Sequence, residues 1–275
     1  MSPRIIAVTN NKGGVGKTTT VVNLAAGLAQ HDRRVLVIDT DPQANGTFAL
    51  LGPQAPKLTL YDALITRTAS LLDLMTPTTI VGVTLIPSHL NLSAADIVLA
   101  GIPGREKLLA RLLKSVTGFD YILIDTPPSL GLLTVNSLTS AREVFIPVGV
   151  GTFALMGIAL LEGTIQQLKE NLELDNLQIS GAIATLYDRT RVAQDTLEAL
   201  QQHFRERLFK SVIPKNKDIE EAHSRSMSVL AYAPHSRGGE AYATLAKEVI
   251  SHEREESPWS NLQSAAIANR VGSHS

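Results

Sequence analysis

A glycine-rich segment with two lysines is the first part of the sequence whose residue types and spacing predict chemistry. Residues 11–20 read NKGGVGKTTT, between a short apolar run at 5–8 and a helical pattern that starts at Thr18. Glycines let the backbone turn tightly, so that successive N–H groups point at phosphate oxygens, and the helix N-terminus adds further donors. This pattern predicts a phosphate loop, in which Lys17 reaches the β- and γ-phosphates and the Thr18 hydroxyl ligates Mg²⁺. The nucleotide-binding candidates in it are Lys12, Gly13, Gly14, Val15, Gly16, Lys17, Thr18 and Thr19.

Carboxylates that would partner a nucleotide follow two other apolar runs. Asp39 and Asp41 follow the run at 35–38, and Asp125 follows the run at 121–124. The carboxyl ends of parallel strands form the edge of a sheet where ligands bind. Because four apolar residues and then an aspartate are typical of a Walker B element, Asp125 is predicted to hold Mg²⁺ through water. Period-two alternation would put Asp39 and Asp41 on the same side, provided that the strand persists that far.

The elements that must position these residues appear as apolar runs that alternate with segments of helical period. Runs suited to buried strands lie at 5–8, 35–38, 83–86, 121–124, 144–148 and 179–184. Helical patterns lie at 18–31, 106–116, 155–172, 192–208 and 239–250. Strands that are apolar on both faces and separated by helices indicate a parallel sheet covered on both sides. We therefore predict an α/β fold with a doubly wound, mostly parallel sheet and helices on both faces.

Composition excludes several classes of protein. The chain has 275 residues, of which 44% are hydrophobic and 19% charged, so there is ample material for a packed core. It contains no cysteine, which excludes a disulfide scaffold, a Cys-ligated metal site and a thiol nucleophile. With 25 Lys and Arg residues against 26 Asp and Glu residues, only a local basic patch could bind nucleic acid. We expect one domain over 1–252, a polar, disordered tail over 253–275, no signal peptide and no membrane-spanning helix.

The segment KGGVGKTT at 12–19 resembles the deviant Walker A box of the ParA/MinD family of ATPases. It departs from the ordinary motif, because Asn11 stands where the first glycine would be and Lys12 stands beside it. In that family, the first lysine reaches the phosphates of the nucleotide bound by the partner subunit. The resemblance therefore implies a P-loop NTPase fold of the deviant Walker A type. It also implies a nucleotide-sandwich homodimer in which Lys12 acts in trans.

Two further segments resemble the switch regions of the same family. DTDPQ at 39–43 is similar to switch I, and DTPPS at 125–129 is similar to switch II. By this resemblance, Asp41 positions or polarises the attacking water, and Asp39 supports the Mg²⁺ shell. The chemistry implied is slow, adaptor-stimulated hydrolysis of ATP that depends on Mg²⁺, with ATP and Mg²⁺ as cofactors. The catalytic candidates are Lys12, Lys17 and Asp41, and the metal-binding candidates are Thr18, Asp39 and Asp125.

Later segments resemble ParA/Soj partition ATPases more than MinD. IPKN at 213–216 is similar to the family's IPRN, a segment that lies against adenine, so Pro214 and Asn216 are the adenine candidates. Residues 205–217 carry five basic side chains against one acidic one, a patch that would neutralise DNA phosphates without reading bases. The DNA-binding candidates are Arg189, Lys210, Lys215, Lys217 and Arg225.

The sequence departs from the family pattern at Gly151, Met156 and His223. We interpret His89, His203 and His223 as ordinary surface or core histidines.

The resemblance implies an ATPase that positions cargo along the nucleoid, such as a chromosome, a plasmid or a protein body such as a carboxysome. Its implied partners in the cytoplasm are a second copy of the chain, nonspecific double-stranded DNA and a ParB-like adaptor. A MinD-like membrane regulator is one alternative, which the acidic tail without an amphipathic anchor disfavours. An ATP-gated binding module with negligible turnover is the other, and the altered Gly151 and Met156 positions keep it open.

Overall fold

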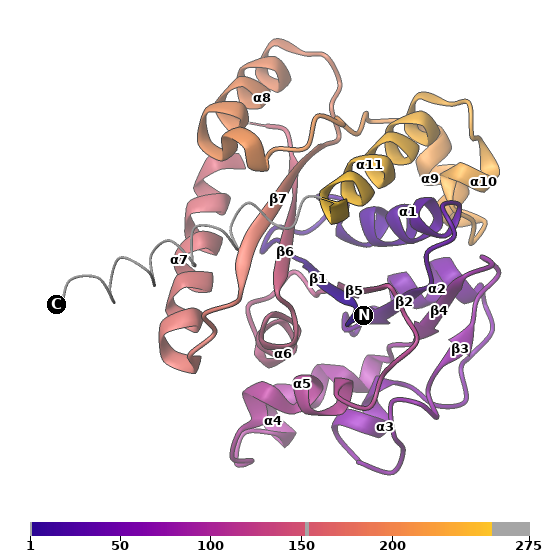
Figure 1. Cartoon of the computed structure of the whole chain (residues 1–275), viewed down its shortest axis with the longest axis vertical. Coiled ribbons are helices and arrows are strands. Elements are labelled where there is room, and N and C mark those ends of the chain that lie inside the picture. Colours follow the sequence, from indigo (N-terminus) through magenta and orange to yellow (C-terminus); the bar gives the residue numbers. More distant parts are fainter. Residues whose placement is uncertain (1, 152–153, 255–275) are drawn as a thin grey trace, which may run out of the picture.

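A seven-stranded sheet forms the centre of the molecule (Figure 1). The computed structural model describes residues 2–151 and 154–254. The strands are β1 (Arg4–Val8), β2 (Val35–Asp39), β3 (Thr76–Pro77), β4 (Val83–Ile86), β5 (Tyr121–Asp125), β6 (Glu143–Gly149) and β7 (Gln178–Thr185). Their order is β3-β4-β2-β5-β1-β6-β7, and every neighbouring pair is parallel except β3 with β4. The predicted doubly wound, mostly parallel sheet is thus confirmed.

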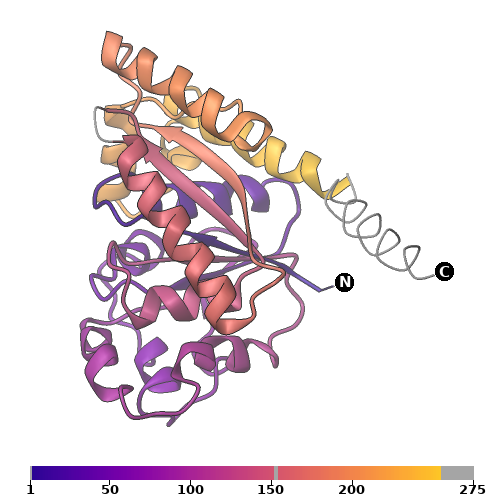
Figure 2. The ribbon, with the colours of Figure 1, turned by 90° about the vertical axis from the view of Figure 1, so that its left-hand side faces the viewer.

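Helices cover both faces of this sheet (Figures 1 and 2). They are α1 (Lys17–Ala29), α2 (Asn45–Leu51), α3 (Leu60–Leu64), α4 (Ala95–Val98), α5 (Leu108–Leu113), α6 (Leu132–Ser140), α7 (Ala154–Leu172), α8 (Arg191–Phe204), α9 (Lys217–Ser224), α10 (Val229–Tyr232) and α11 (Arg237–Arg254). Three 3₁₀ turns are η1 (Leu90–Ala94), η2 (Arg105–Lys107) and η3 (Arg205–Arg207). Helices α1, α2 and α9–α11 pack on one face, and α3–α8 pack on the other.

The central strands are buried on both faces, as their apolar runs predict. All five residues of β2 and all five of β5 are buried. In β2, Val35 and Val37 join the core beneath α1 and α11, whereas Leu36 and Ile38 join the core on the opposite face. Burying one such side chain stabilises the fold by about 1.5–3 kcal/mol. The last residue of each strand is buried but is not apolar: it is Asp39 in β2 and Asp125 in β5. In these two strands, acidic side chains therefore occur only at the carboxyl edge of the sheet.

All six expected strands are present, and the expected helices differ mainly at their ends. The pattern at 192–208 is helical only to Phe204, because Arg205 adopts a φ of 52° that ends α8 before η3. The pattern at 106–116 divides into η2 and α5. Strand β3 and the helices α2, α3, α4, α6, α9 and α10 were not expected, because short segments show too few turns for a period to stand out.

Helix α11 continues two residues into the predicted tail, to Arg254. The Glu253 carboxylate accepts a hydrogen bond from Arg33 at 2.8 Å and another from the Tyr121 hydroxyl, which ties the end of the helix to the sheet. The rest of the predicted tail, 255–275, lies outside the described residues. Within the described part of the chain, no helix is both long and apolar enough to cross a membrane.

Candidate nucleotide site

The predicted phosphate loop connects β1 to α1 and is left open by its glycines. Gly14 and Gly16 have φ angles of 71° and 86°, in the left-handed region that side chains other than glycine rarely adopt. A Cβ atom built on Gly13 or Gly14 would meet nothing within 4 Å, so the loop surrounds free space. Two distant residues anchor it, since Asn10 Nδ2 donates to the Pro147 carbonyl and the Thr185 hydroxyl donates to the Val15 carbonyl, each at 2.8 Å.

The two lysines of the loop have different environments. Lys17 is buried, and its Nζ donates to the Lys12 carbonyl at 3.2 Å. Burial lowers the pKa of Lys17, while the Asp125 and Asp41 carboxylates oppose that shift. The Lys12 side chain is exposed, and its backbone N–H is fixed by Asn10 Oδ1 at 3.0 Å. Lys17 is therefore held inside its own loop, whereas Lys12 is accessible to a second molecule.

Asp39 and Asp125 lie side by side at the ends of neighbouring strands, directly opposite each other in the β2–β5 register. The Asp39 Oδ2 atom accepts hydrogen bonds from the Thr47 N–H at 2.7 Å and the Thr47 hydroxyl at 2.8 Å. Neither carboxylate oxygen of Asp125 has a hydrogen-bond partner among the described residues, although both are buried. A Cβ on Gly46 would lie 3.1 Å from Asp39 Oδ2 and 3.2 Å from Asp125 Oδ2, so only glycine leaves room here.

This pair of carboxylates fits a divalent cation. Burial raises the pKa of Asp39 to about 6, and burial with the neighbouring Asp39 charge raises the pKa of Asp125 well above its ordinary range. A buried carboxylate without a partner is costly unless a cation or a proton neutralises it. Mg²⁺ prefers oxygen ligands and keeps several waters, so it needs few protein groups. Among residues 2–151 and 154–254, no group of three or more His, Cys, Asp or Glu side chains could hold a metal ion.

Asp41 lies beyond the end of β2, so strand alternation does not govern its direction. Its backbone N–H donates to Asp39 Oδ1 at 3.1 Å, and its own Oδ1 accepts from the Gln43 N–H at 3.0 Å. The expected same-side placement of Asp39 and Asp41 does not follow from strand geometry, because the strand stops at Asp39. The chain bends after β2 instead, and Asp41 lines the same cavity as the residues of the phosphate loop.

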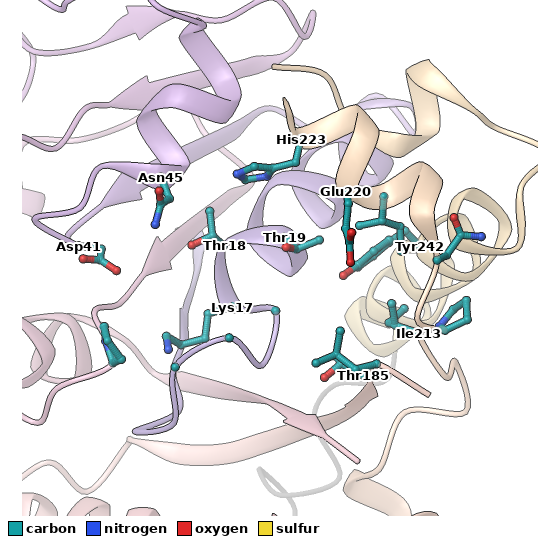
Figure 3. Close-up of a pocket in the computed structure, with 18 of the residues that line it drawn as sticks. Lys17, Thr18, Thr19, Asp41, Asn45, Thr185, Ile213, Glu220, His223 and Tyr242 are labelled. Atoms are coloured by element: carbon teal, nitrogen blue, oxygen red, sulfur yellow. The ribbon is translucent and has the colours of Figure 1, made fainter. Parts of the chain in front are cut away.

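A cavity of about 520 Å³ joins the phosphate loop to the segment that carries Pro214 and Asn216 (Figure 3). Lys17, Thr18 and Asp41 line one part of it, and Pro214 and Asn216 line another. Two contacts hold the second part in place. The backbone of Pro214 pairs with that of Tyr187 in an isolated β-bridge. The Asn216 side chain accepts a hydrogen bond from the Asp218 N–H at 2.7 Å and so caps the start of α9. The structure therefore brings together residues almost 200 positions apart in the sequence.

The cavity is also lined by residues that the sequence analysis did not assign to the nucleotide site. Asn45, Glu220 and His223 line it, with Thr185 and Tyr242 (Figure 3). The interpretation of His223 as an ordinary histidine did not anticipate its place in the lining of this cavity. Burial lowers the pKa of its imidazole. Glu220 and His223 are three residues apart and share one face of α9. That spacing is the one sequence signal that would have placed them together.

The five DNA-binding candidates are all exposed. Lys215 lies beside the segment that carries Arg189, because its N–H donates to the Tyr187 carbonyl at 3.0 Å. Lys217 begins α9, and Arg225 follows its end. Lys210 stands apart, where its backbone N–H donates to Glu248 at 2.9 Å.

The paired carboxylates predict an unusual dependence of stability on pH. An aspartate titrates near 3.8 in the unfolded chain, so a folded pKa of about 6 for Asp39 means that the folded state binds more protons in between. The free energy of unfolding of the nucleotide-free protein should therefore fall as pH rises through this window. Asp125→Asn removes the coupled charge and should raise that free energy at pH 7.5 by about 1–3 kcal/mol, with little effect at pH 4.

Urea unfolding in the presence of a chelator, at several pH values, measures this difference. Asp175→Asn is a matched control, because Asp175 is exposed. An Asp125→Asn protein that is less stable than the wild type at pH 7.5 would contradict the prediction.

The strand, the glycine loop, the helix and the paired carboxylates define a P-loop nucleoside triphosphatase. A family model described as an AAA domain matches residues 3–179. The sporulation initiation inhibitor protein Soj of Bacillus subtilis (strain 168) is 42% identical over 252 residues, which cover 90% of this chain and 99% of Soj. The chain thus belongs to this AAA-domain family and, within it, to the ParA/Soj-type partition ATPases, which confirms the resemblance seen in the loop.

Two other known proteins are similar to this chain over most of its length. The chromosome partitioning protein ParA of Caulobacter vibrioides (strain NA1000 / CB15N) is 39% identical over 257 residues, which cover 92% of this chain and 96% of ParA. A crystal structure titled cobyrinic acid a,c-diamide synthase from Mycobacterium smegmatis, with bound ATP analog and magnesium, superposes with a TM-score of 0.79. It is 33% identical, and the match covers 92% of this chain and 97% of that one.

Proposed function

We propose that this chain is a Mg²⁺-dependent ATPase that positions or segregates intracellular cargo, with ATP and Mg²⁺ as its cofactors. Its ATP-bound form pairs with a second copy, binds double-stranded DNA nonspecifically, and is released when a ParB-like adaptor stimulates slow hydrolysis. The observation that carries the proposal is the buried Asp125 carboxylate, which has no hydrogen-bond partner among residues 2–151 and 154–254 and lies close enough to Lys17 of the phosphate loop for the two charges to interact. The similarity to Soj, which is named as an inhibitor of sporulation initiation, and to ParA, which is named as a chromosome partitioning protein, also supports the proposal.

The chemistry follows from what each side chain can do. The N–H groups of 13–17 and the Lys17 ammonium bind the phosphates and offset charge on their oxygens. Thr18, Asp39 and Asp125 hold Mg²⁺, directly or through water, and the bound ion supplies further charge neutralisation. Asp41 orients a water molecule for attack on the γ-phosphate. Pro214 and Asn216 contact the adenine on the opposite side of the cavity.

Lys12 supports the proposed dimer. Its side chain is exposed at the rim of the loop, while its backbone is fixed by Asn10 and accepts from Lys17. A fixed backbone with an accessible ammonium group suits a contact with phosphates bound by a partner subunit. Two chains that close face to face over their nucleotides would thus each donate Lys12 in trans.

The DNA contact is predicted to depend on Lys215 and Lys217. Both are exposed and flank Asn216, which lines the nucleotide cavity, so they lie on the surface next to the proposed adenine contact. Replacing both with alanine should weaken DNA binding about 10-fold or more at low salt and reduce the slope of log K against log salt by roughly 2 per subunit. Fluorescence anisotropy with DNA duplexes at several salt concentrations measures this.

ATP-dependent dimerisation of the same variant provides its control and should be unchanged. Lys57→Ala combined with Lys114→Ala is a matched double variant, because both lysines are exposed and lie outside the cavity. Unchanged DNA affinity of the Lys215→Ala/Lys217→Ala protein would count against this surface.

Co-sedimentation with ATP and Mg²⁺ tests the proposed function itself. Binding to DNA but not to anionic lipid vesicles is expected, together with phosphate release that rises when DNA and adaptor are added. Binding to vesicles alone would instead favour a MinD-like regulator. No phosphate release under any condition would favour an ATP-gated binding module.

Association with the nucleoid in the cytoplasm is part of the same proposal, and fluorescence microscopy of a tagged chain tests it.

A further inference from the structure

A closed ring of buried hydrogen bonds surrounds the backbone of Asp41. The Ser88 hydroxyl donates to the Asp41 carbonyl at 2.6 Å, and the Ser88 N–H donates to the Thr47 hydroxyl oxygen at 2.8 Å. Thr47 in turn donates to Asp39 Oδ2 at 2.8 Å, and Asp39 Oδ1 accepts from the Asp41 N–H at 3.1 Å. The ring thus bonds both backbone polar groups of Asp41, and its carbonyl also accepts from the Ala44 N–H at 2.9 Å.

Three separate parts of the chain meet in this ring. Ser88 follows β4, Thr47 lies in the first turn of α2, and Asp39 ends β2. Ser88 is 2% exposed and Thr47 is 6% exposed, so water does not replace a bond that is lost. Buried polar groups left without partners are costly, which makes such a fully satisfied network rigid.

We infer that Ser88 and Thr47 are positioning residues for ATP hydrolysis, which hold the main chain of Asp41 so that its carboxylate faces the phosphate loop. Neither lines the nucleotide cavity, and they act through Asp41. The inference rests on the proposed role of Asp41 in orienting water. Ser88 is the sharper test of the two, because it bonds Asp41 directly, whereas Thr47 also holds the metal-binding candidate Asp39.

The geometry predicts a specific split between binding and turnover. Ser88 does not line the cavity that contains Lys17, the loop glycines and Pro214, so removal of its hydroxyl should leave the Kd for ATP within about twofold. The main chain around Asp41 gains freedom, and a displacement near 1 Å at a catalytic group costs on the order of 100-fold in rate. We expect Ser88→Ala to lower kcat by about 10- to 100-fold and to prolong the life of the ATP-bound dimer.

The experiment compares Ser88→Ala with Ser140→Ala, a matched control. Ser140 is also a buried serine that donates to a backbone carbonyl at 2.6 Å, but within α6 and away from Asp41. For each protein, the Kd for ATP, the kcat with Mg²⁺ and DNA, and the thermal midpoint are measured. Amide hydrogen exchange of 40–47 is also followed without nucleotide, where Ser88→Ala should exchange at least about 10-fold faster than the wild type.

A second pair of variants separates the hydroxyl from side-chain volume. Thr47→Ser keeps the hydroxyl and should keep the wild-type kcat, whereas Thr47→Val removes it at similar volume and should lower kcat. The inference is overturned if Ser88→Ala loses only as much thermal stability as Ser140→Ala while kcat and exchange at 40–47 stay at wild-type values. A wild-type protein without any turnover would overturn the proposed function instead, and the exchange comparison would still decide whether Ser88 holds Asp41.

Discussion

Lys17→Ala is expected to weaken ATP binding by about 100-fold or more, which is the largest effect predicted for any single substitution in this chain. The side chain is buried in the phosphate loop and bonded to the Lys12 carbonyl, so it can turn to bound phosphates with little further loss of conformational freedom. It also offsets the charges of Asp41, which lines the cavity, and of the buried Asp125. Without it, a triphosphate would lose a strong, charge-assisted hydrogen bond. It would also meet the like charges of the carboxylates without the Lys17 ammonium group to offset them.

Isothermal titration with an ATP analogue and Mg²⁺ measures this loss. Lys114→Ala is the control, because Lys114 is an exposed lysine after α5 and outside the cavity. The Lys17→Ala protein should keep the wild-type far-UV circular dichroism, which separates lost binding from lost folding. Unchanged affinity for the analogue would show that 11–20 is not the phosphate loop.

Asp41→Ala has the second largest expected effect and acts on turnover instead of binding. It should leave the Kd for ATP within a few fold and lower kcat by about 100-fold or more, because a positioned carboxylate contributes 10²–10⁴-fold to such a step. The ATP-bound dimer would then persist, since hydrolysis is what releases it in the proposed cycle. Size-exclusion chromatography with light scattering, run with ATP and with ADP, measures the trapped dimer.

Lys12→Ala in the Asp41→Ala background provides the informative control. If Lys12 contacts the nucleotide of the partner subunit, the double variant should bind ATP and elute as a monomer. An Asp41→Ala protein that binds no nucleotide would show that Asp41 has a binding role, and the assignment of water positioning would be wrong. A double variant that stays dimeric would place the dimer contact elsewhere.

Much of the fold was predictable because its signals are local. Buried parallel strands are apolar on both faces, so β1, β2 and β4–β7 stand out as short runs that no other element produces. The glycines and lysines at 11–20 identify the loop for the same reason, because phosphate binding needs these residue types at this spacing. Short elements such as β3 and α10 carry no such signal, since two or four residues cannot display a period.

The sequence by itself thus determined the sheet, the loop and the identities of its charged residues. Tertiary structure decided where those residues meet. The β2–β5 register sets Asp39 beside Asp125, the end of β2 frees Asp41 to turn toward the loop, and α9 carries His223 into the cavity. These placements depend on hydrogen bonds between segments tens to hundreds of residues apart, such as Thr185 to Val15 and Ser88 to Asp41. A local pattern specifies burial and period, but which partner a buried polar group finds is fixed only when the chain has folded.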